Sequence, residues 1–96
     1  MAIDSLVKVK RDEILKVAAR HGVTNVKVFG SAARGEITDK SDIDFLVETG
    51  EVRSSFFPGG LIADLEELLG RRVDVVEPDG LHWFVRDRIL KEAVLL

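Results

Sequence analysis

Two stretches in the first half of the chain decide its fold: residues 28–35 read VFGSAARG, and residues 41–47 read SDIDFLV. In the second stretch every other residue is apolar, which is the period of a β-strand with one buried face. Asp42 and Asp44 share the opposite face, about 6.5–7 Å apart along the strand, and Leu46 continues that face. The first stretch predicts the end of a strand, a Gly-Ser turn and a short helical turn.

The segments outside this centre predict a small α+β domain in which helices cover a mixed α/β sheet. In chain order, the sequence predicts a helix over 10–21, strands over 25–29 and 42–48, a helix over 61–69, a strand over 72–77 and a last helix from 81. Asp4 or Ser5 could cap the first helix, and Asp79 the last, in which Phe84 is expected in the core. No repeat or linker divides the chain, so we expect one domain over residues 1–96.

Composition excludes several classes of protein. The chain is 46% hydrophobic and 32% charged, which is typical of a folded domain, and it has no cysteine. Disulfides, zinc ribbons, iron–sulfur clusters and thiol catalysis are therefore excluded. No apolar run approaches a membrane span, and no secretion signal is found, so we expect a cytoplasmic protein. The net charge of −3 argues against direct nucleic-acid binding.

The Asp42–Asp44 pair has a functional and a structural interpretation. Two carboxylates on one strand face can bind one divalent cation or bridge two, and hard oxygen ligands suit Mg²⁺ or Mn²⁺. For a lone Asp-x-Asp, a solvent-facing strand is the commoner explanation. Here Leu46 continues the same face and the strand is otherwise apolar, which favours a functional pair.

Two further features could complete a site. Gly30-Ser31 offers backbone N–H groups and a hydroxyl between a strand and a helical turn, as a phosphate cradle would, although a tight turn capped by Ser31 is the simpler alternative. Neither a Walker P-loop nor a dinucleotide fingerprint is present. Asp74 lies mid-strand and would add a third carboxylate if its strand lay beside that of Asp44. Otherwise Asp74 faces outward or pairs with Arg71 or Arg72.

Taken together, Gly30 to Gly35 followed by Ser41-Asp42-Ile43-Asp44 resembles the signature of the DNA polymerase beta-like nucleotidyltransferase superfamily, and more narrowly its minimal nucleotidyltransferase (MNT) domains. The resemblance covers most of the chain. It implies that Gly30 and Ser31 hold the β- and γ-phosphates of ATP, that Asp42 and Asp44 bind two Mg²⁺ ions, and that Asp74 completes the metal site. The reaction implied is transfer of AMP to an acceptor with release of pyrophosphate.

Other residues keep two interpretations. Arg34 could contact phosphate or a partner, or could tether its turn through backbone carbonyls or Asp39, and the tether is favoured. His21 and His82 are expected on helix surfaces, away from any metal. Trp83 could be exposed and mark a partner surface. Residues 56–57, both phenylalanine, could pack inward or cover the open groove in which a substrate of so small a domain would sit.

Small MNT domains are typically antitoxins that act beside HEPN-domain toxins, so the resemblance implies that the acceptor is a tyrosine of such a toxin. The alternative is a binding module that inhibits its partner by contact, with idle carboxylates. A weaker third hypothesis is a transferase for a small molecule. Homo- or hetero-oligomerisation stays open.

Overall fold

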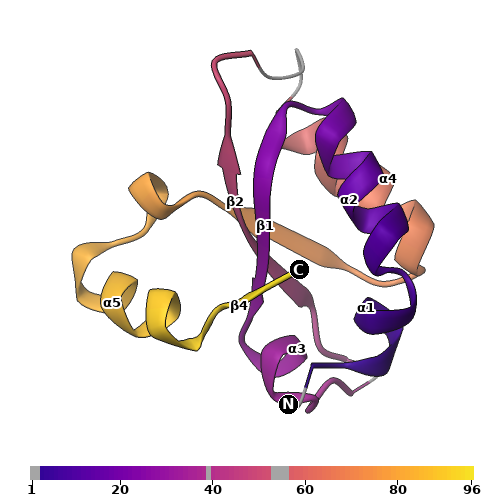
Figure 1. The fold of residues 1–96 in the computed structure, drawn as a ribbon. Helices are drawn as coiled ribbons and strands as arrows, with labels where there is room; N and C mark the ends of the chain where they lie inside the picture. Colours follow the sequence, from indigo (N-terminus) through magenta and orange to yellow (C-terminus); the bar gives the residue numbers. More distant parts are fainter. Residues whose placement is uncertain (1–2, 39, 53–56) are drawn as a thin grey trace.

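A four-stranded sheet forms the centre of the computed structural model, which describes residues 3–38, 40–52 and 57–96 (Figure 1). The strands are β1 (Val23–Phe29), β2 (Ile43–Thr49), β3 (Val73–Val76) and β4 (Val94–Leu95), in the spatial order β3-β2-β1-β4. β1 runs antiparallel to both β2 and β4, whereas β2 and β3 are parallel. The predicted α+β fold with a mixed sheet is confirmed.

Helices lie on both sides of this sheet. They are α1 (Ser5–Val9), α2 (Arg11–Arg20), α3 (Ser31–Arg34), α4 (Gly59–Leu69), the 3₁₀ turn η1 (Pro78–Gly80) and α5 (Trp83–Glu92). α2 and α4 lie side by side against one face, and α5 extends from the other side (Figure 1). Among the residues that the structure describes, no helix has both the length and the apolar character needed to traverse a bilayer.

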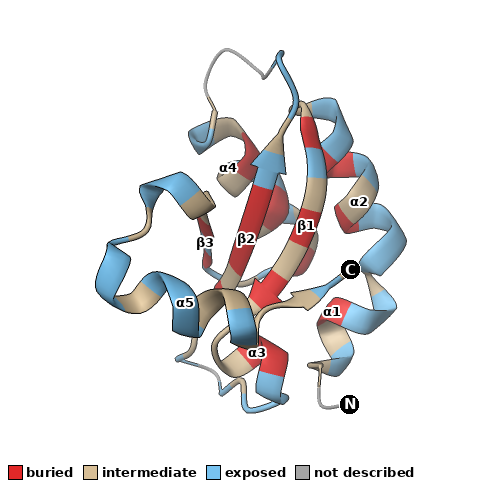
Figure 2. Ribbon diagram, turned by 60° about the vertical axis from the view of Figure 1, so that its left-hand side comes forward, coloured by how far each residue is buried: buried red, intermediate tan, exposed pale blue. Residues whose placement is uncertain are grey.

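The hydrophobic core lies between the sheet and the helices α2 and α4 (Figure 2). Ile43, Phe45 and Val47 of β2 are at most 1% exposed, which confirms the buried face predicted from the alternation. Leu61 and Leu65 of α4, one helical turn apart, are equally buried. Leu46, on the other face of β2, is only 2% exposed, so the face that carries Asp44 is not simply a solvated surface.

The helix ends largely follow the predicted signals. The segment expected as one helix over 10–21 is preceded by the short α1, and the two meet at Lys10. Asp4 caps α1, since its carboxylate accepts a hydrogen bond from the Leu6 N–H at 2.9 Å. Gly35 and Gly70 end α3 and α4 in the left-handed region, with φ of 68° and 65°, which glycine adopts without steric cost.

The C-terminal segment corrects the sequence analysis. Phe84 was expected in the core but is 76% exposed, and no residue of α5 is buried. Asp79 does not cap this helix, because it lies in η1, and the Nδ1 of His82 accepts the hydrogen bond from the Phe84 N–H at 3.1 Å instead. The apolar spacing of α5 therefore does not mark a buried stripe.

The strand β4 that follows α5 was also not predicted. It pairs antiparallel with β1, where Lys27 faces Leu95 and Val28 faces Val94. Arg11 holds the residue after it, because its Nε and Nη2 donate hydrogen bonds to the carbonyl oxygen of Leu96 at 3.0 and 2.7 Å. This pairing returns the chain to the sheet and fixes the far end of α5.

Candidate active site

The strand register brings two of the predicted carboxylates together. Asp44 of β2 lies directly opposite Asp74 of β3 in the parallel ladder, and opposite Phe29 at the end of β1. Residues in register across parallel strands project from the same face, with the strands about 4.8 Å apart. The prediction that Asp74 lies beside the Asp42–Asp44 strand, on the same face as Asp44, agrees with this geometry. Asp42 stands one residue before β2 and is exposed.

Among these carboxylates, Asp44 has a raised pKa. Burial, and then the negative charges of Asp74, Asp42 and Glu92, raise the pKa of Asp44 from 3.8 to about 6. The charged form is therefore disfavoured both by lost hydration and by repulsion from its neighbours. A cation bound among these carboxylates would relieve the repulsion.

Gly30 places the turn after β1 against the Asp44 carboxylate. Its φ is 66°, and a Cβ built on it would lie 2.7 Å from the Asp44 Oδ2. A side chain at this position would force the Asp44 carboxylate to shift, and the backbone conformation is itself unfavourable for residues other than glycine. The turn predicted to cradle phosphate thus lies next to the carboxylates predicted to bind metal.

Ser31 is the first residue of α3 and does not cap it. The N-cap is Gly30, and no side-chain hydrogen bond caps the helix, so the interpretation of Ser31 as a helix cap is wrong. Because α3 has only four residues, its dipole is small. Any anion here would be held by backbone N–H groups and the hydroxyl rather than by a helix dipole.

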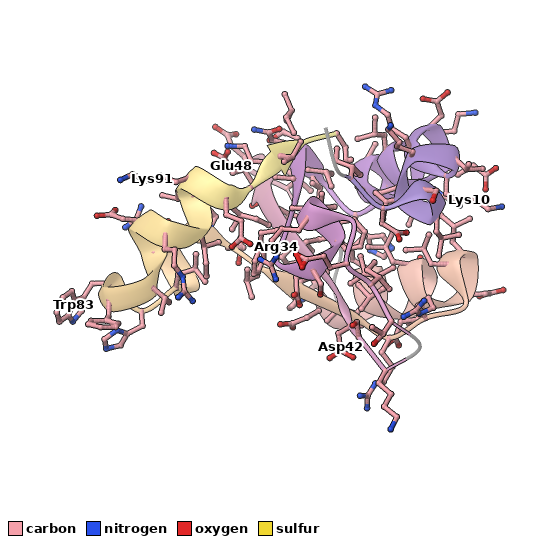
Figure 3. The ribbon with its side chains drawn as sticks, turned by 90° about the horizontal axis from the view of Figure 1, so that it is seen from below. Lys10, Arg34, Asp42, Glu48, Trp83 and Lys91 are labelled. Carbon is pink, nitrogen blue, oxygen red and sulfur yellow. The ribbon has the colours of Figure 1, made fainter. Side chains whose placement is uncertain are left out.

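Arg34, at the end of α3, forms ion pairs with two carboxylates. Its Nε donates to the Glu36 Oε1 at 2.7 Å, and its Nη1 donates to the Glu92 Oε1. The second pair links α3 to α5, so Arg34 does tether its turn, but through side-chain carboxylates. The expected partner Asp39 lies outside the described residues. In Figure 3, Arg34 lies between α5 and the body of the sheet.

A groove of about 490 Å³ runs between the Gly30 turn and α5. Its lining residues come from the end of β1, the turn, α3 and α5, and they are Phe29, Gly30, Arg34, Arg88, Ile89 and Glu92. Neither Arg88 nor Glu92 was among the site residues predicted from the sequence. Their spacing of four residues, which puts both on one helix face, is the signal that could have grouped them.

A second groove, of about 510 Å³, lies on the other side of Asp42 and is lined by Lys40, Ser41, Gly70, Arg71 and Arg72. The Arg72 Nε donates to the Asp42 Oδ1 at 3.2 Å, and the Arg71 Nη2 donates to the Ser41 carbonyl at 3.1 Å. Arg71 also donates to the Thr38 carbonyl. Within the described residues Asp74 forms no ion pair with Arg71 or Arg72, so the alternative in which it pairs with one of them is not supported.

The donor set fits a divalent cation, although the side chains do not yet converge. Within residues 3–38, 40–52 and 57–96, no three acidic or histidine side chains gather closely enough to form a metal site. The Asp42 carboxylate accepts a hydrogen bond from the Arg72 Nε at 3.2 Å. Burial and the neighbouring negative charges raise the pKa of Asp44, so a bound cation would stabilise its charged form.

The remaining candidates lie away from the carboxylates. The His21 Nε2 hydrogen-bonds the Asp64 Oδ2 at 2.7 Å and so links α2 to α4, and His82 caps α5. Trp83 is 77% exposed, as expected, and points away at the far end of α5 (Figure 3). Phe57 packs against the core, whereas residue 56 lies outside the described residues.

Two known proteins resemble most of this chain in sequence. The chain is 45% identical over 87 residues to the "Putative protein adenylyltransferase MJ0435" of Methanocaldococcus jannaschii, covering 91% of this chain and 92% of that protein. It is 37% identical over 92 residues to the "Protein adenylyltransferase MntA" of Thermococcus cleftensis, covering 96% and 90%.

Solved structures share the fold. A "putative minimal nucleotidyltransferase" matches with a TM-score of 0.85 and 41% identity, over 100% of this chain and 99% of that one. A toxin–antitoxin complex with AMP-PNP matches with a TM-score of 0.73 at 20% identity, over 88% and 69%. A complex of a tri-AMPylated Shewanella oneidensis HEPN toxin with its MNT antitoxin matches with 0.67 at 17%, over 92% and 69%. The last two likenesses concern the fold alone.

The sequence model of the nucleotidyltransferase domain matches residues 11–96, from the start of α2 to the end of β4 and beyond. That range contains the Gly30 turn, the β2 carboxylates and Asp74. The match, together with the relatives above, shows that this chain is a transferase that belongs to the nucleotidyltransferase family.

Proposed function

We propose that this chain transfers AMP from ATP to a tyrosine of a HEPN-domain toxin in a Mg²⁺-dependent reaction, and so acts as the antitoxin of a pair. The observation that carries the proposal is the strand register that sets Asp44 beside Asp74, with the Gly30 turn against Asp44. The names of the relatives support AMP transfer to a protein. The AMPylated HEPN toxin seen beside a protein of this fold suggests the acceptor class.

The three carboxylates would hold the metal. Asp42, Asp44 and Asp74 supply the hard oxygen ligands, and bound Mg²⁺ would neutralise charge on the attacking and leaving oxygens. Asp44 is half-buried and in register with Asp74, whereas Asp42 and Asp74 are exposed, so Asp44 would be the least hydrated of the three ligands before a cation binds. Arg72 would hold Asp42 until nucleotide and metal arrive, which keeps the exposed carboxylate of Asp42 paired in their absence.

The chemical step would be an in-line displacement at the α-phosphorus. The tyrosine oxygen forms a bond to that phosphorus, the bond to the bridging oxygen breaks, and pyrophosphate leaves from the Gly30-Ser31 turn. Asp74 would accept the tyrosine proton, a role supported by its exposed position on the edge strand β3, which an acceptor can approach from solvent.

The acceptor protein would dock beside α5. Trp83 and Phe84 are 77% and 76% exposed, and their rings stand edge to face with centroids 5.8 Å apart. Exposed aromatic pairs of this kind mark interaction sites. Glu92, at the other end of the same helix, lines the groove next to Gly30, so a partner that covers the whole length of α5 would reach the site. The partner would thereby complete a site that is open in this chain alone.

The test uses radiolabelled ATP, Mg²⁺ and a purified HEPN toxin encoded beside the gene. Wild-type protein is expected to transfer label to the toxin and to block its ribonuclease activity, and mass spectrometry should place AMP on a tyrosine. Asp42→Asn and Asp44→Asn should each reduce transfer by about a thousandfold, because each removes a metal ligand. Asp87→Asn, an exposed carboxylate on α5, is the control and should retain transfer.

The binding-module alternative gives the opposite result. If the Asp42→Asn and Asp44→Asn proteins still neutralise the toxin and no label is transferred by the wild type, inhibition is by contact. Transfer of label to a residue other than tyrosine would keep the enzyme and correct the acceptor.

A further inference from the structure

The strand register places a cation beside the three carboxylates of the site. Asp44 lies opposite Asp74 in the parallel ladder, and the same register, extended back by one step of the alternation, sets Asp42 opposite Arg72. Residues two apart on an extended chain project from the same face, so all four side chains share one face of the sheet. The Arg72 Nε accordingly donates to the Asp42 Oδ1 at 3.2 Å. Arg72 is the cationic member of this array.

The array borders the second groove described above, which we call the basic groove. Its volume is about 510 Å³, and it is lined by Lys40, Ser41, Gly70, Arg71 and Arg72. These lining residues include three cations and no carboxylate. The basic groove is therefore opposite in sign to the chain as a whole, whose net charge is −3.

The three cations of the basic groove differ in what they already bind. Arg71 is fixed in the wall, because its Nη2 donates to the carbonyl oxygens of both Thr38 and Ser41. The hydrogen bond from Arg72 to the array uses its Nε, which leaves the two terminal nitrogens for an incoming anion. Lys40 is exposed and forms no ion pair within the described part of the chain. Lys40 and Arg72 can thus bind an anion that enters the groove.

We propose that the basic groove binds an acidic side chain of the acceptor protein, and so selects acceptors in which aspartate or glutamate flanks the tyrosine. The inference rests on the proposed function and adds a specificity site to it. Arg72 stands two residues before Asp74, the residue that would accept the tyrosine proton. An acceptor carboxylate bound to the planar guanidinium of Arg72 would hold the neighbouring tyrosine near Asp74.

The position and extent of the basic groove favour a protein carboxylate as its ligand. The groove and the Gly30 turn lie on opposite sides of Asp42, so an anion here does not compete with a triphosphate at that turn. Nucleic acid needs a broad basic surface that follows its backbone, whereas these cations are confined to one groove beside three carboxylates. A single acidic side chain needs only two cations.

The experiment measures the steady-state kinetics of label transfer from ATP to the purified HEPN toxin, with Mg²⁺ and the full chain. Lys40→Glu is expected to raise the KM for the toxin about tenfold, because the reversed charge repels the acceptor carboxylate. The kcat and the calorimetric affinity for ATP should stay within about twofold, since Lys40 lies away from the Gly30 turn. Lys16→Glu, the same charge change at an exposed position of α2, is the matched control and should leave the KM unchanged. Thermal unfolding checks that both variants fold.

A charge swap identifies the ligand. Each acidic residue that flanks the acceptor tyrosine of the toxin is changed in turn to lysine. One of these toxin variants should raise the KM with the wild-type chain and restore it with Lys40→Glu, a rescue that a merely structural Lys40 would not give. Added KCl should raise the KM of the wild type more than that of Lys40→Glu, because salt screens the attraction.

Each outcome decides one question. A KM for Lys40→Glu that equals that of Lys16→Glu, or the lack of any rescuing toxin variant, overturns the acidic-acceptor site while leaving the proposed reaction intact. Fluorescein-labelled poly(U) RNA that binds the wild type and not Lys40→Glu would assign the groove to nucleic acid instead. A wild-type chain that transfers no label overturns the proposed reaction itself. Calorimetric binding of the toxin, weakened by Lys40→Glu and not by Lys16→Glu, would then still decide whether the groove holds an acidic partner.

Discussion

The two sides of the sheet are held in different ways. On one side, α2 and α4 bury apolar side chains against β1 and β2, and the largest fully buried residue, Phe45, points into that layer. On the other side, α5 buries no residue and is fixed by the β4 pairing and by the Arg34–Glu92 ion pair. The α2–α4 side is therefore a packed hydrophobic core, whereas on the α5 side an exposed helix borders a groove lined by charged side chains.

This difference separates stability from function. Substitutions on the α2–α4 side should change the free energy of unfolding, because they open cavities in packed apolar surface. Substitutions on the α5 side should change binding while leaving the fold nearly untouched, since exposed side chains contribute little to stability. Phenylalanine occurs on both sides, which permits a direct test.

Phe45→Ala is expected to lower the free energy of unfolding by about 4 kcal/mol, because a fully buried aromatic ring leaves a cavity. Phe84→Ala, at a site that is 76% exposed, should change it by less than about 0.5 kcal/mol. Urea denaturation followed by circular dichroism measures both. A loss of more than about 2 kcal/mol in Phe84→Ala would mean that α5 is packed as tightly as the other helices, and the contrast would fail.

The core side is also the part of the fold that sequence pattern predicts well. In β2 the alternation of apolar residues predicts the buried residues correctly, and in α4 the four-residue spacing of Leu61 and Leu65 does the same. Both patterns succeed because one face of each element packs against the core. Phe84 shows the limit of the same rule. Apolar spacing in α5 predicts an apolar helix face, but it cannot distinguish a face buried in the core from an exposed face that could bind a partner.

β4 escaped prediction for another reason. It has two residues, Val94 and Leu95, and pairs with β1 only through Lys27 and Val28. So short a strand has no period of its own. Its existence depends on β1 offering an edge, which is a property of the assembled sheet rather than of the local sequence.

In the candidate site, too, local sequence spacing predicts some residues, whereas others depend on contacts across the fold. Local spacing is enough to identify Asp42, Asp44 and the Gly30 turn. Whether Asp74 lies beside them depends on β3 being the parallel neighbour of β2. The pairing of Arg72 with Asp42 and the position of Glu92 also arise from contacts across the fold. Sequence spacing can nominate such residues, and only strand order and helix placement bring them together.

A substitution at Gly30, where the turn contacts Asp44, tests the α5 side of the sheet, which holds the groove and is called the groove side below. Gly30→Ala is expected to cost about 2 kcal/mol, because φ is positive and the new methyl group would meet the Asp44 Oδ2 at 2.7 Å. Displacing that carboxylate should also reduce AMP transfer. Chemical denaturation measures the first effect, and the labelled-ATP assay measures the second.

Two other glycines separate the cost of the positive φ from the cost of the contact with Asp44. Gly70→Ala has positive φ but nothing within 4 Å of the new Cβ, so it should lose about 1 kcal/mol from the backbone alone. Gly59→Ala, at the start of α4 with open space around it, should be neutral or slightly stabilising. Equal losses at Gly30 and Gly70 would show that the Asp44 contact contributes nothing.

The smallest expected effect concerns the charge on Asp44. The pKa of Asp44 is raised to about 6 in the folded chain, against 3.8 in the absence of its neighbours. The folded state therefore binds more protons than the unfolded state between about pH 4 and 6, and stability falls as the pH rises through that window. Asp44→Asn removes the charge, so it should stabilise the metal-free protein above pH 6 by about 1 kcal/mol, a value discounted for solvent screening at this half-exposed group.

Denaturation in EDTA at pH 4 and pH 8 measures this effect, with Asp87→Asn on the exposed face of α5 as the control. The gain in Asp44→Asn should be present at pH 8 and absent at pH 4, whereas Asp87→Asn should match the wild type at both. Added Mg²⁺ should then stabilise the wild type but not Asp44→Asn, because bound cation relieves the same repulsion. An Asp44→Asn protein that is less stable than the wild type at pH 8 without metal would show that the carboxylate is held by favourable contacts. The groove side would then contribute to stability as the core side does.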